Sequence, residues 1–112
     1  MGPFAAGEVI LVHFPFSDLT ASKLRPAVVL ADAGRGDSIL CQVTSKPYGD
    51  SKAILLEAKD FARGSLRLAS YARHGKLFTA HGSLVANQIG VLGGAKFSSI
   101  QQAVLRMIQT GS

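Results

Sequence analysis

The 112-residue sequence lacks most of the residues that build common cofactor and metal sites. It contains no tryptophan and a single cysteine, Cys41, so it cannot form an internal disulfide and offers no pair of thiolate ligands. His13, His74 and His81 do not have the spacing of a metal site. The Gly90–Gly94 run lacks the lysine of a phosphate-binding loop, so we expect a turn there, and no Gly-x-Ser-x-Gly motif occurs. We therefore expect no cofactor and no metal.

Long apolar runs are also missing. The N-terminal stretch has no basic start, and its apolar run from Val9 to Val12 is too short for a signal peptide. No segment approaches transmembrane length, so we expect a cytoplasmic protein without a membrane partner. Hydrophobic residues make up 47% of the chain, which is ample for one core, and we expect residues 1–112 to form a single domain. Cys41, within an apolar run, is expected to be a small core residue.

Acidic residues are absent from the second half of the chain. Residues 1–60 contain six basic and all seven acidic residues, a balance of 6 − 7 = −1. Residues 61–112 contain six basic residues and no carboxylate, a balance of +6. A half without acidic side chains suits a polyanionic partner such as a nucleic acid. The alternative interpretation is ordinary surface charge.

The first two thirds of the sequence read as short strands. Predicted turns or loops lie between them, at Ser17–Leu24, Asp32–Asp37 and Lys46–Asp50. Short strands with apolar faces at this spacing predict a small barrel or a strongly coiled sheet. The predicted strands are Gly7–Phe14, Arg25–Ala31 with Pro26 at its start, Ser38–Ser45, Ala53–Glu57, and Leu66–Phe78 with a bend at Gly75.

A helix is predicted at the C-terminal end of the chain. Five apolar residues recur there with helical spacing, namely Ile100, Ala103, Val104, Met107 and Ile108. Ser98 followed by Gln101 fits a capping box, and Gly111 fits a C-terminal stop. We expect this apolar stripe to pack against the sheet.

Arg25 is the first candidate for a functional residue. Pro26 restricts the backbone of Arg25 to extended angles, and the guanidinium offers a planar set of donors that matches phosphate oxygens. An arginine that is fixed at a sheet edge, after a loop that contains Lys23, suits a phosphate clamp. The hydroxyls of Thr44 and Ser45 can donate to a phosphate oxygen, although hydroxyls at strand ends also cap turns. The alternative for Arg25 is a surface arginine at a strand start.

A second candidate set lies in the predicted fifth strand. Arg67, Tyr71 and Arg73 recur with period two and are expected to share one face. Two cations beside an aromatic ring suit a single-stranded nucleic acid, with backbone contacts to the arginines and base stacking on the tyrosine. The alternative is a solvated face of the sheet.

The order of these segments resembles the MazF/PemK family of toxins from bacterial toxin–antitoxin modules. The similarity covers nearly the whole chain and rests on the spacing of several short motifs. They are Gly7–Val12, Phe14–Asp18, Arg25–Leu30, Val43–Ser45, Ser65–Arg73, Lys76–Thr79 and Ile89–Leu92 before a terminal helix.

The resemblance implies a mainly β fold with a C-terminal helix, the SH3-like small barrel of MazF/PemK/CcdB-like toxins. It implies a homodimeric endoribonuclease and growth inhibitor that cleaves single-stranded mRNA at specific sequences without a metal. It also implies an antitoxin that wraps the dimer, with DNA contacted at an operator only in complex with that antitoxin. Arg25 would stabilise the phosphate, Thr44 would be its hydroxyl partner, and the Ser17–Leu24 loop would contact RNA and antitoxin. Expected RNA-binding residues are Lys23, Ser45, Arg67, Ser70, Tyr71 and Arg73.

The chemistry of RNA fits these residue types. The 2′-OH of the RNA is the nucleophile, so the protein must align it and stabilise the added negative charge. The expected products are a 2′,3′-cyclic phosphate and a 5′-OH. The general base is unassigned, with His13, Asp18 and His74 as candidates. Some relatives have a longer, His-bearing loop and an acidic residue in the fifth strand, where this chain has Ser70.

Two other functions compete with RNA cleavage. A non-catalytic member would bind nucleic acid or an antitoxin, which the missing base favours. Gyrase-poisoning toxins share the fold but act through a tryptophan near the C-terminus, and this chain has none.

Overall fold

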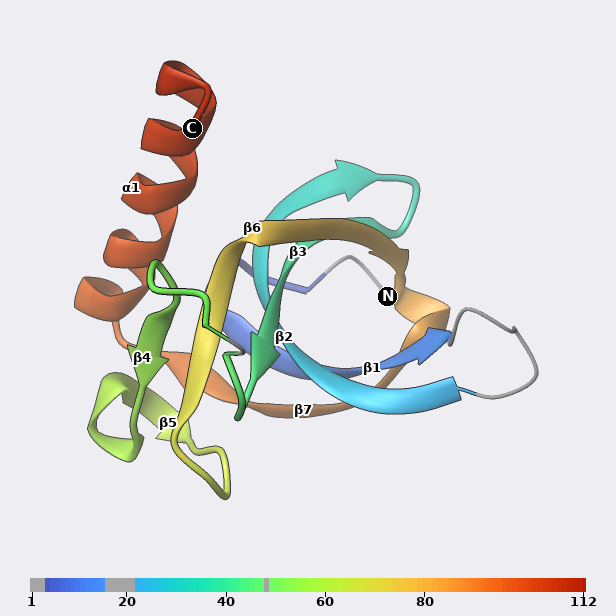
Figure 1. The fold of residues 1–112 in the computed structure, drawn as a ribbon. Coiled ribbons are helices and arrows are strands. Elements are labelled where there is room, and N and C mark those ends of the chain that lie inside the picture. The colour runs from blue at the N-terminus through green and yellow to red at the C-terminus, as the bar shows by residue number, and fades with distance from the viewer. Residues whose placement is uncertain (1–3, 16–21, 48) are drawn as a thin grey trace.

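Seven strands form one antiparallel sheet in a computed structural model that describes residues 4–15, 22–47 and 49–112 (Figure 1). The strand order is β4-β6-β3-β2-β1-β7-β5, so β4 and β5 are the two edges of a curled half-barrel. Its elements are β1 (Glu8–Pro15), β2 (Ser22–Gly34), β3 (Asp37–Thr44), β4 (Ile54–Leu56), η1 (Ala58–Asp60), β5 (Phe61–Gly64), β6 (Ser70–His81), η2 (Gly82–Leu84), β7 (Val85–Leu92) and α1 (Gly94–Thr110).

The mainly β class with a C-terminal helix is confirmed, but two strands differ from the prediction. β5 was not predicted, and β7 includes the Gly90–Leu92 segment for which we predicted a turn, so that prediction is wrong. The sequence of β7 carries Asn, Gln and Gly, which are weak strand formers, and pairing with both β1 and β5 overrides this weakness. β6 starts later than predicted, at Ser70, which leaves Arg67 outside the strand.

The bend predicted at Gly75 is confirmed by the pairing of β3 with β6. Cys41 pairs with Leu77, whereas the next residue of β3, Gln42, pairs with Arg73. Residues 74–76 of β6 therefore have no partner in β3 and form a bulge. A bulge of this kind bends a strand and increases its twist, which helps the sheet to curl.

Apolar side chains fill both faces of the curled sheet. Along β2, Val28 belongs to one hydrophobic cluster while Ala27 and Val29 belong to another, as expected for alternating side chains. The first cluster includes Cys41, which is fully buried as predicted, and Ile100 of α1. Burial on both faces explains why the central strands read as nearly continuous apolar runs.

Two features of β2 fix its pairing with its neighbours. The β2–β3 hairpin turns through Arg35 and Gly36, with φ of 58° and 81°, and two central residues with positive φ match the right-handed twist of the strands. Pro26 lies inside β2 and not at its start as predicted. Pairing with β3 begins only at Ala27, so Pro26 lies in the part of β2 that pairs with β1 alone.

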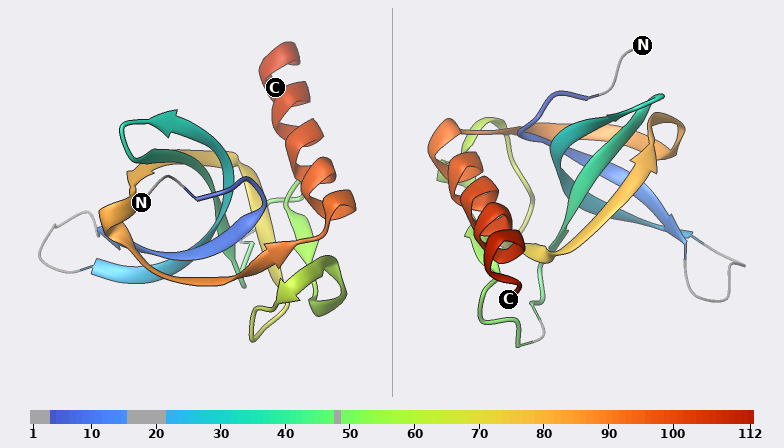
Figure 2. Two further views of the ribbon diagram at one scale, coloured as in Figure 1. Left: turned by 180° about the vertical axis from the view of Figure 1, so that it is seen from behind. Right: turned by 90° about the horizontal axis from the view of Figure 1, so that it is seen from above.

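The terminal helix lies along one side of the sheet (Figure 2). It begins at Gly94 after the N-cap Gly93, so the predicted capping box at Ser98 is wrong and Ser98 lies in the first turns of the helix. The predicted stop is confirmed, because Gly111 has a φ of 76° and its N–H donates to the Met107 carbonyl at 2.9 Å. Within α1 only Ile100 is buried, and Ile108 is 67% exposed. Among the described residues, no helix has the length and hydrophobicity to cross a membrane.

Candidate functional site

A cavity of about 600 Å³ is lined by residues of β1, β2, β3, β6 and β7 and by residues 65–68 of the loop before β6. We call it the Arg25 pocket. Its lining brings together six of the eight residues predicted for the site, which are Lys23, Arg25, Thr44, Ser45, Arg67 and Ser70. Tyr71 and Arg73 do not belong to this lining.

Arg25 and Thr44 are placed side by side by the register of β2 and β3. Ala27 pairs with Gln42, and Arg25 and Thr44 each lie two residues further along their strand. Residues two apart share a face, and so do cross-strand neighbours, so Arg25 and Thr44 occupy the same side of the sheet. Both side chains are partly buried. Arg25 and Thr44 are therefore neighbours in the sheet, although they are far apart in the sequence.

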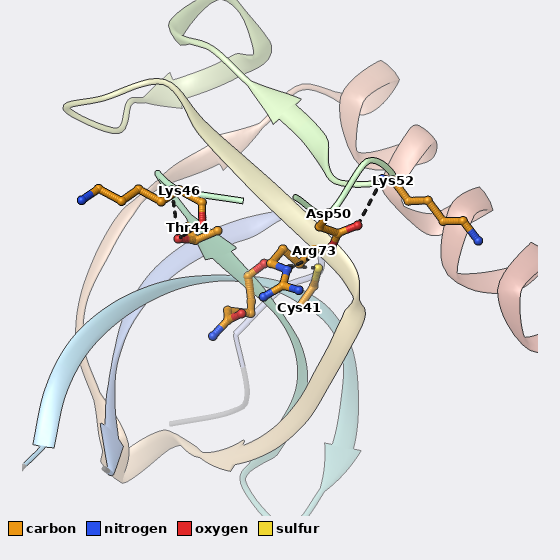
Figure 3. A network of polar contacts seen from close by, with 7 residues as sticks. Cys41, Thr44, Lys46, Asp50, Lys52 and Arg73 are labelled. Atoms are coloured by element: carbon orange, nitrogen blue, oxygen red, sulfur yellow. Dashed lines mark hydrogen bonds and ion pairs between the residues drawn. The ribbon is translucent and has the colours of Figure 1, made fainter. Parts of the chain in front are cut away.

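The hydroxyl of Thr44 caps the turn that follows β3 (Figure 3). It donates to the Lys46 carbonyl at 3.1 Å and accepts from the Lys46 N–H, also at 3.1 Å. The turn-capping role weighed for this residue is thus confirmed. The bond donated by the hydroxyl is longer than the usual 2.5–3.0 Å of an O–H···O contact, so a phosphate oxygen can compete for it.

The charged side chains in the described lining of the Arg25 pocket are all positive. Lys23, Arg25 and Arg67 line it, and the lining contains no Asp, Glu or His among the described residues. None of these three cations forms an ion pair within the described part of the chain. Apolar side chains complete the wall, including Leu66 and Ile89. A cationic rim over an apolar wall suits a phosphate attached to a planar base.

A close crossing of β5 and β7 holds the loop at residues 65–69 beside the pocket. Gly64 pairs with Gly90, and a Cβ on either residue would collide with the backbone of the opposite strand. Glycine is therefore required at both positions for the strands to approach this closely. Arg67 in the following loop reaches the pocket because of this crossing.

Arg73 forms an ion pair and does not line the Arg25 pocket. Its Nε donates to Asp50 Oδ2 at 3.0 Å, with both side chains 22% exposed (Figure 3). This hydrogen bond holds the pKa of the Asp50 carboxyl below its ordinary value, helped by the N–H of Lys52. The predicted common face of Arg67, Tyr71 and Arg73 is wrong, because Arg67 precedes β6 and only the other two lie in the strand.

Neither of the two candidate bases that the structure describes lines the Arg25 pocket. His13 is exposed on β1 and His74 lies in the β6 bulge, and neither belongs to the lining. Asp18, with residues 17–21 of the predicted loop, lies outside the described residues, while Lys23 and Leu24 belong to β2. Within the described ranges, no three His, Cys, Asp or Glu side chains are grouped as metal ligands would be.

β7 adds residues that the sequence did not reveal. Asn87 and Gln88 line the Arg25 pocket, and Asn87 pairs with Leu11 of β1. Gln88 Nε2 donates to Glu8 Oε1 at 2.6 Å, which ties β7 to the start of β1. These amides were missed because no strand was predicted over residues 85–92.

Comparison with known families gives a match over most of the chain. The model of the PemK-like, MazF-like toxins of type II toxin–antitoxin systems matches residues 5–108. No curated protein sequence matches the chain significantly.

Solved structures share the fold at low sequence identity. A MazE–MazF complex from Deinococcus radiodurans is 18% identical with a TM-score of 0.75, over 95% of this chain and 96% of that one. MazF from the same organism is 20% identical with a TM-score of 0.73, over the same shares of both chains. A mycobacterial endoribonuclease in complex with its cognate antitoxin is 12% identical with a TM-score of 0.72, over 97% of this chain and 96% of that one.

Proposed function

Because the chain belongs to the PemK-like, MazF-like toxins of type II toxin–antitoxin systems, we propose that it is an endoribonuclease that cleaves single-stranded RNA at the Arg25 pocket. The observation that carries the proposal is the composition of this pocket, in which three cations and the hydroxyls of Thr44, Ser45 and Ser70 meet with no carboxylate in the described lining. Such a site attracts a phosphodiester and stabilises further negative charge on it.

In the proposed reaction the 2′-oxygen of a ribose attacks the adjacent phosphorus. A bond forms between the 2′-oxygen and phosphorus, and the bond from phosphorus to the 5′-oxygen breaks. The 2′-OH loses its proton and the departing 5′-oxygen gains one, which gives a 2′,3′-cyclic phosphate and a 5′-OH. Charge builds up on the non-bridging oxygens, where the guanidinium of Arg25 can donate two parallel hydrogen bonds.

The other residues of the pocket have supporting roles in this proposal. Thr44 exchanges its 3.1 Å bond to the Lys46 carbonyl for a bond to a phosphate oxygen. Lys23 and Arg67 hold the neighbouring phosphates, and Ser45 and Ser70 contact the RNA. Tyr71, which lies in β6 outside the lining, contacts the RNA beyond the pocket. The described lining holds no carboxylate or imidazole, so the proposal assigns the acceleration to alignment and charge stabilisation.

A second candidate function is binding of RNA, or of an antitoxin, without cleavage. It is favoured by the same absence of a proton acceptor from the described lining.

We also propose a homodimer and a cognate antitoxin as partners, with operator DNA bound only through the antitoxin. Leu68 is 66% exposed and supplies apolar surface for such partners. A monomeric mass by light scattering at working concentrations would contradict the homodimer.

The test compares three purified proteins on a long single-stranded RNA in EDTA. The wild type is expected to cut at a short recurring sequence, and Arg25→Ala to be slower by about 10²–10³-fold, as for the loss of one donor to a developing oxyanion. Arg63→Ala is the matched control, since Arg63 is exposed on β5 and does not line the pocket. Equal rates for the wild type and Arg25→Ala would contradict the assignment. Intact RNA that is nevertheless retarded on a gel would support the binding function.

A further inference from the structure

A second basic cavity lies between β4, the β6 bulge and α1. Its volume is about 630 Å³, and it shares no lining residue with the Arg25 pocket. Three basic side chains from separate segments line it, Lys52 before β4, His74 in the bulge and Arg106 in α1. We call it the Lys52 pocket.

The two permanent cations of the Lys52 pocket have no carboxylate partner in the described part of the chain. Asp50 is the nearest acidic residue in sequence, but its Oδ2 accepts from Arg73 at 3.0 Å and its Oδ1 accepts from the Lys52 backbone N–H at 3.1 Å. The Lys52 side chain extends away from Asp50 towards α1, where Arg106 lies (Figure 3). Ser112 also lines the pocket, and no ion pair joins it to Lys52 or Arg106.

His74 lines this cavity and has a ring nitrogen without a hydrogen-bond partner in the described part of the chain. Its Nδ1 is buried and has no partner among the described residues. A buried nitrogen without a partner is unfavourable, so a ring rotation that brought it to a ligand oxygen would gain a hydrogen bond. The bulge at residues 74–76 places the ring there, because these residues leave the ladder with β3.

We propose that the Lys52 pocket binds a phosphate group. Lys52 and Arg106 carry two positive charges, which a phosphate monoester balances in full and an RNA phosphodiester, with its one negative charge, balances in part. The hydroxyls of Ser99 and Thr110 already donate within α1, to the carbonyls of Ala95 at 3.2 Å and Arg106 at 2.9 Å. The donors to the ligand are therefore Lys52, Arg106 and His74. The phosphate belongs either to a small phosphorylated molecule or to an RNA backbone, and binding does not depend on the proposed cleavage.

The experiment follows backbone amide signals by NMR while inorganic phosphate is added at constant ionic strength. The amides of Met107, which lines the pocket, and of Gly75, which follows His74 in the chain, are expected to shift and saturate with phosphate and not with chloride. Lys52→Ala and Arg106→Ala are each expected to weaken this binding by about tenfold, as for the loss of one charge-assisted hydrogen bond. Lys76→Ala is the matched control, because Lys76 is exposed on β6 and lines neither pocket.

Repeating the titration with a mononucleotide and with a 2′-O-methyl RNA, which cannot be cleaved, identifies the source of the phosphate. Tighter binding of the RNA that is weakened by Arg106→Ala assigns the site to a backbone phosphate, and equal binding assigns it to a small molecule. Amide shifts that grow linearly with phosphate concentration, or that are equally large with chloride, would mean an adventitious ion only and overturn the proposal. It would also be overturned by shifts confined to the Arg25 pocket, or by a glutamate-rich peptide that binds these amides more tightly than phosphate.

Discussion

Truncation of Ile100 is expected to loosen the terminal helix from the sheet. Ile100 is 0% exposed, is the only buried residue of α1, and packs in the cluster that contains Val9, Val28 and Cys41. Removing a fully buried isoleucine side chain down to alanine costs about 2–5 kcal/mol. In a domain of this size that loss lowers the melting temperature by about 8–20 °C. Thermal and urea unfolding, followed by circular dichroism, measure both quantities.

Ile108→Ala is the matched control on the same helix. Ile108 is 67% exposed, so the same change of side chain is expected to alter stability by no more than about 0.5 kcal/mol. The reasoning would be refuted if the two variants lost equal stability, because the apolar stripe would then be covered along its whole length. A small loss for Ile100→Ala, with an unchanged denaturant slope, would show that the helix is not held by this contact.

Three further predictions concern charged and nucleophilic side chains. Asp50, whose pKa is lowered by Arg73, stabilises the fold above the ordinary pKa of an aspartate, and this stability is lost as pH falls through the lowered value. Asp50→Asn should therefore cost up to about 1 kcal/mol at pH 6, and in urea titrations this cost should shrink as the pH falls below the ordinary pKa of an aspartate. Burial raises the pKa of the Cys41 thiol to about 12, so a disulfide reagent at pH 8 should modify it only in denaturant, and rapid labelling of the native protein would contradict its burial. Arg67→Ala should reduce the salt slope of RNA binding by about 0.7, as for one lost phosphate contact, whereas Arg73→Ala should leave it unchanged.

The sequence predicts the fold where burial dominates the pattern. The runs around Val9, Val28 and Cys41 are apolar because both faces of these strands are covered. The predicted bounds of these strands therefore agree with the observed ones within a few residues. β5 and β7 were not predicted because their polar and glycine residues have little strand propensity. Their pairing depends on the crossing of Gly64 and Gly90, which are 26 residues apart in the chain.

The candidate site was predictable in composition and only partly in arrangement. Arg25 was singled out by its neighbour Pro26 and by the chemistry of its guanidinium, and the register of β2 and β3 places it beside Thr44. The ion pair of Arg73 was not predicted, because its partner, Asp50, lies 23 residues away in a loop whose path the sequence does not reveal. The period-two spacing placed Arg73 on the same face of β6 as Tyr71. It could not show that Arg73 forms an ion pair with Asp50.

Cleavage of an RNA with one 2′-deoxy nucleotide at the cut site tests the central claim most directly. The proposed reaction uses the 2′-OH as nucleophile, so this RNA should stay intact at that position while other sites are still cut. The products of the unmodified RNA should carry a 2′,3′-cyclic phosphate and a 5′-OH, and with Arg25→Ala both should form more slowly by about 10²–10³-fold. Cleavage at the deoxy position at the normal rate would contradict the account, because the nucleophile would then come from elsewhere.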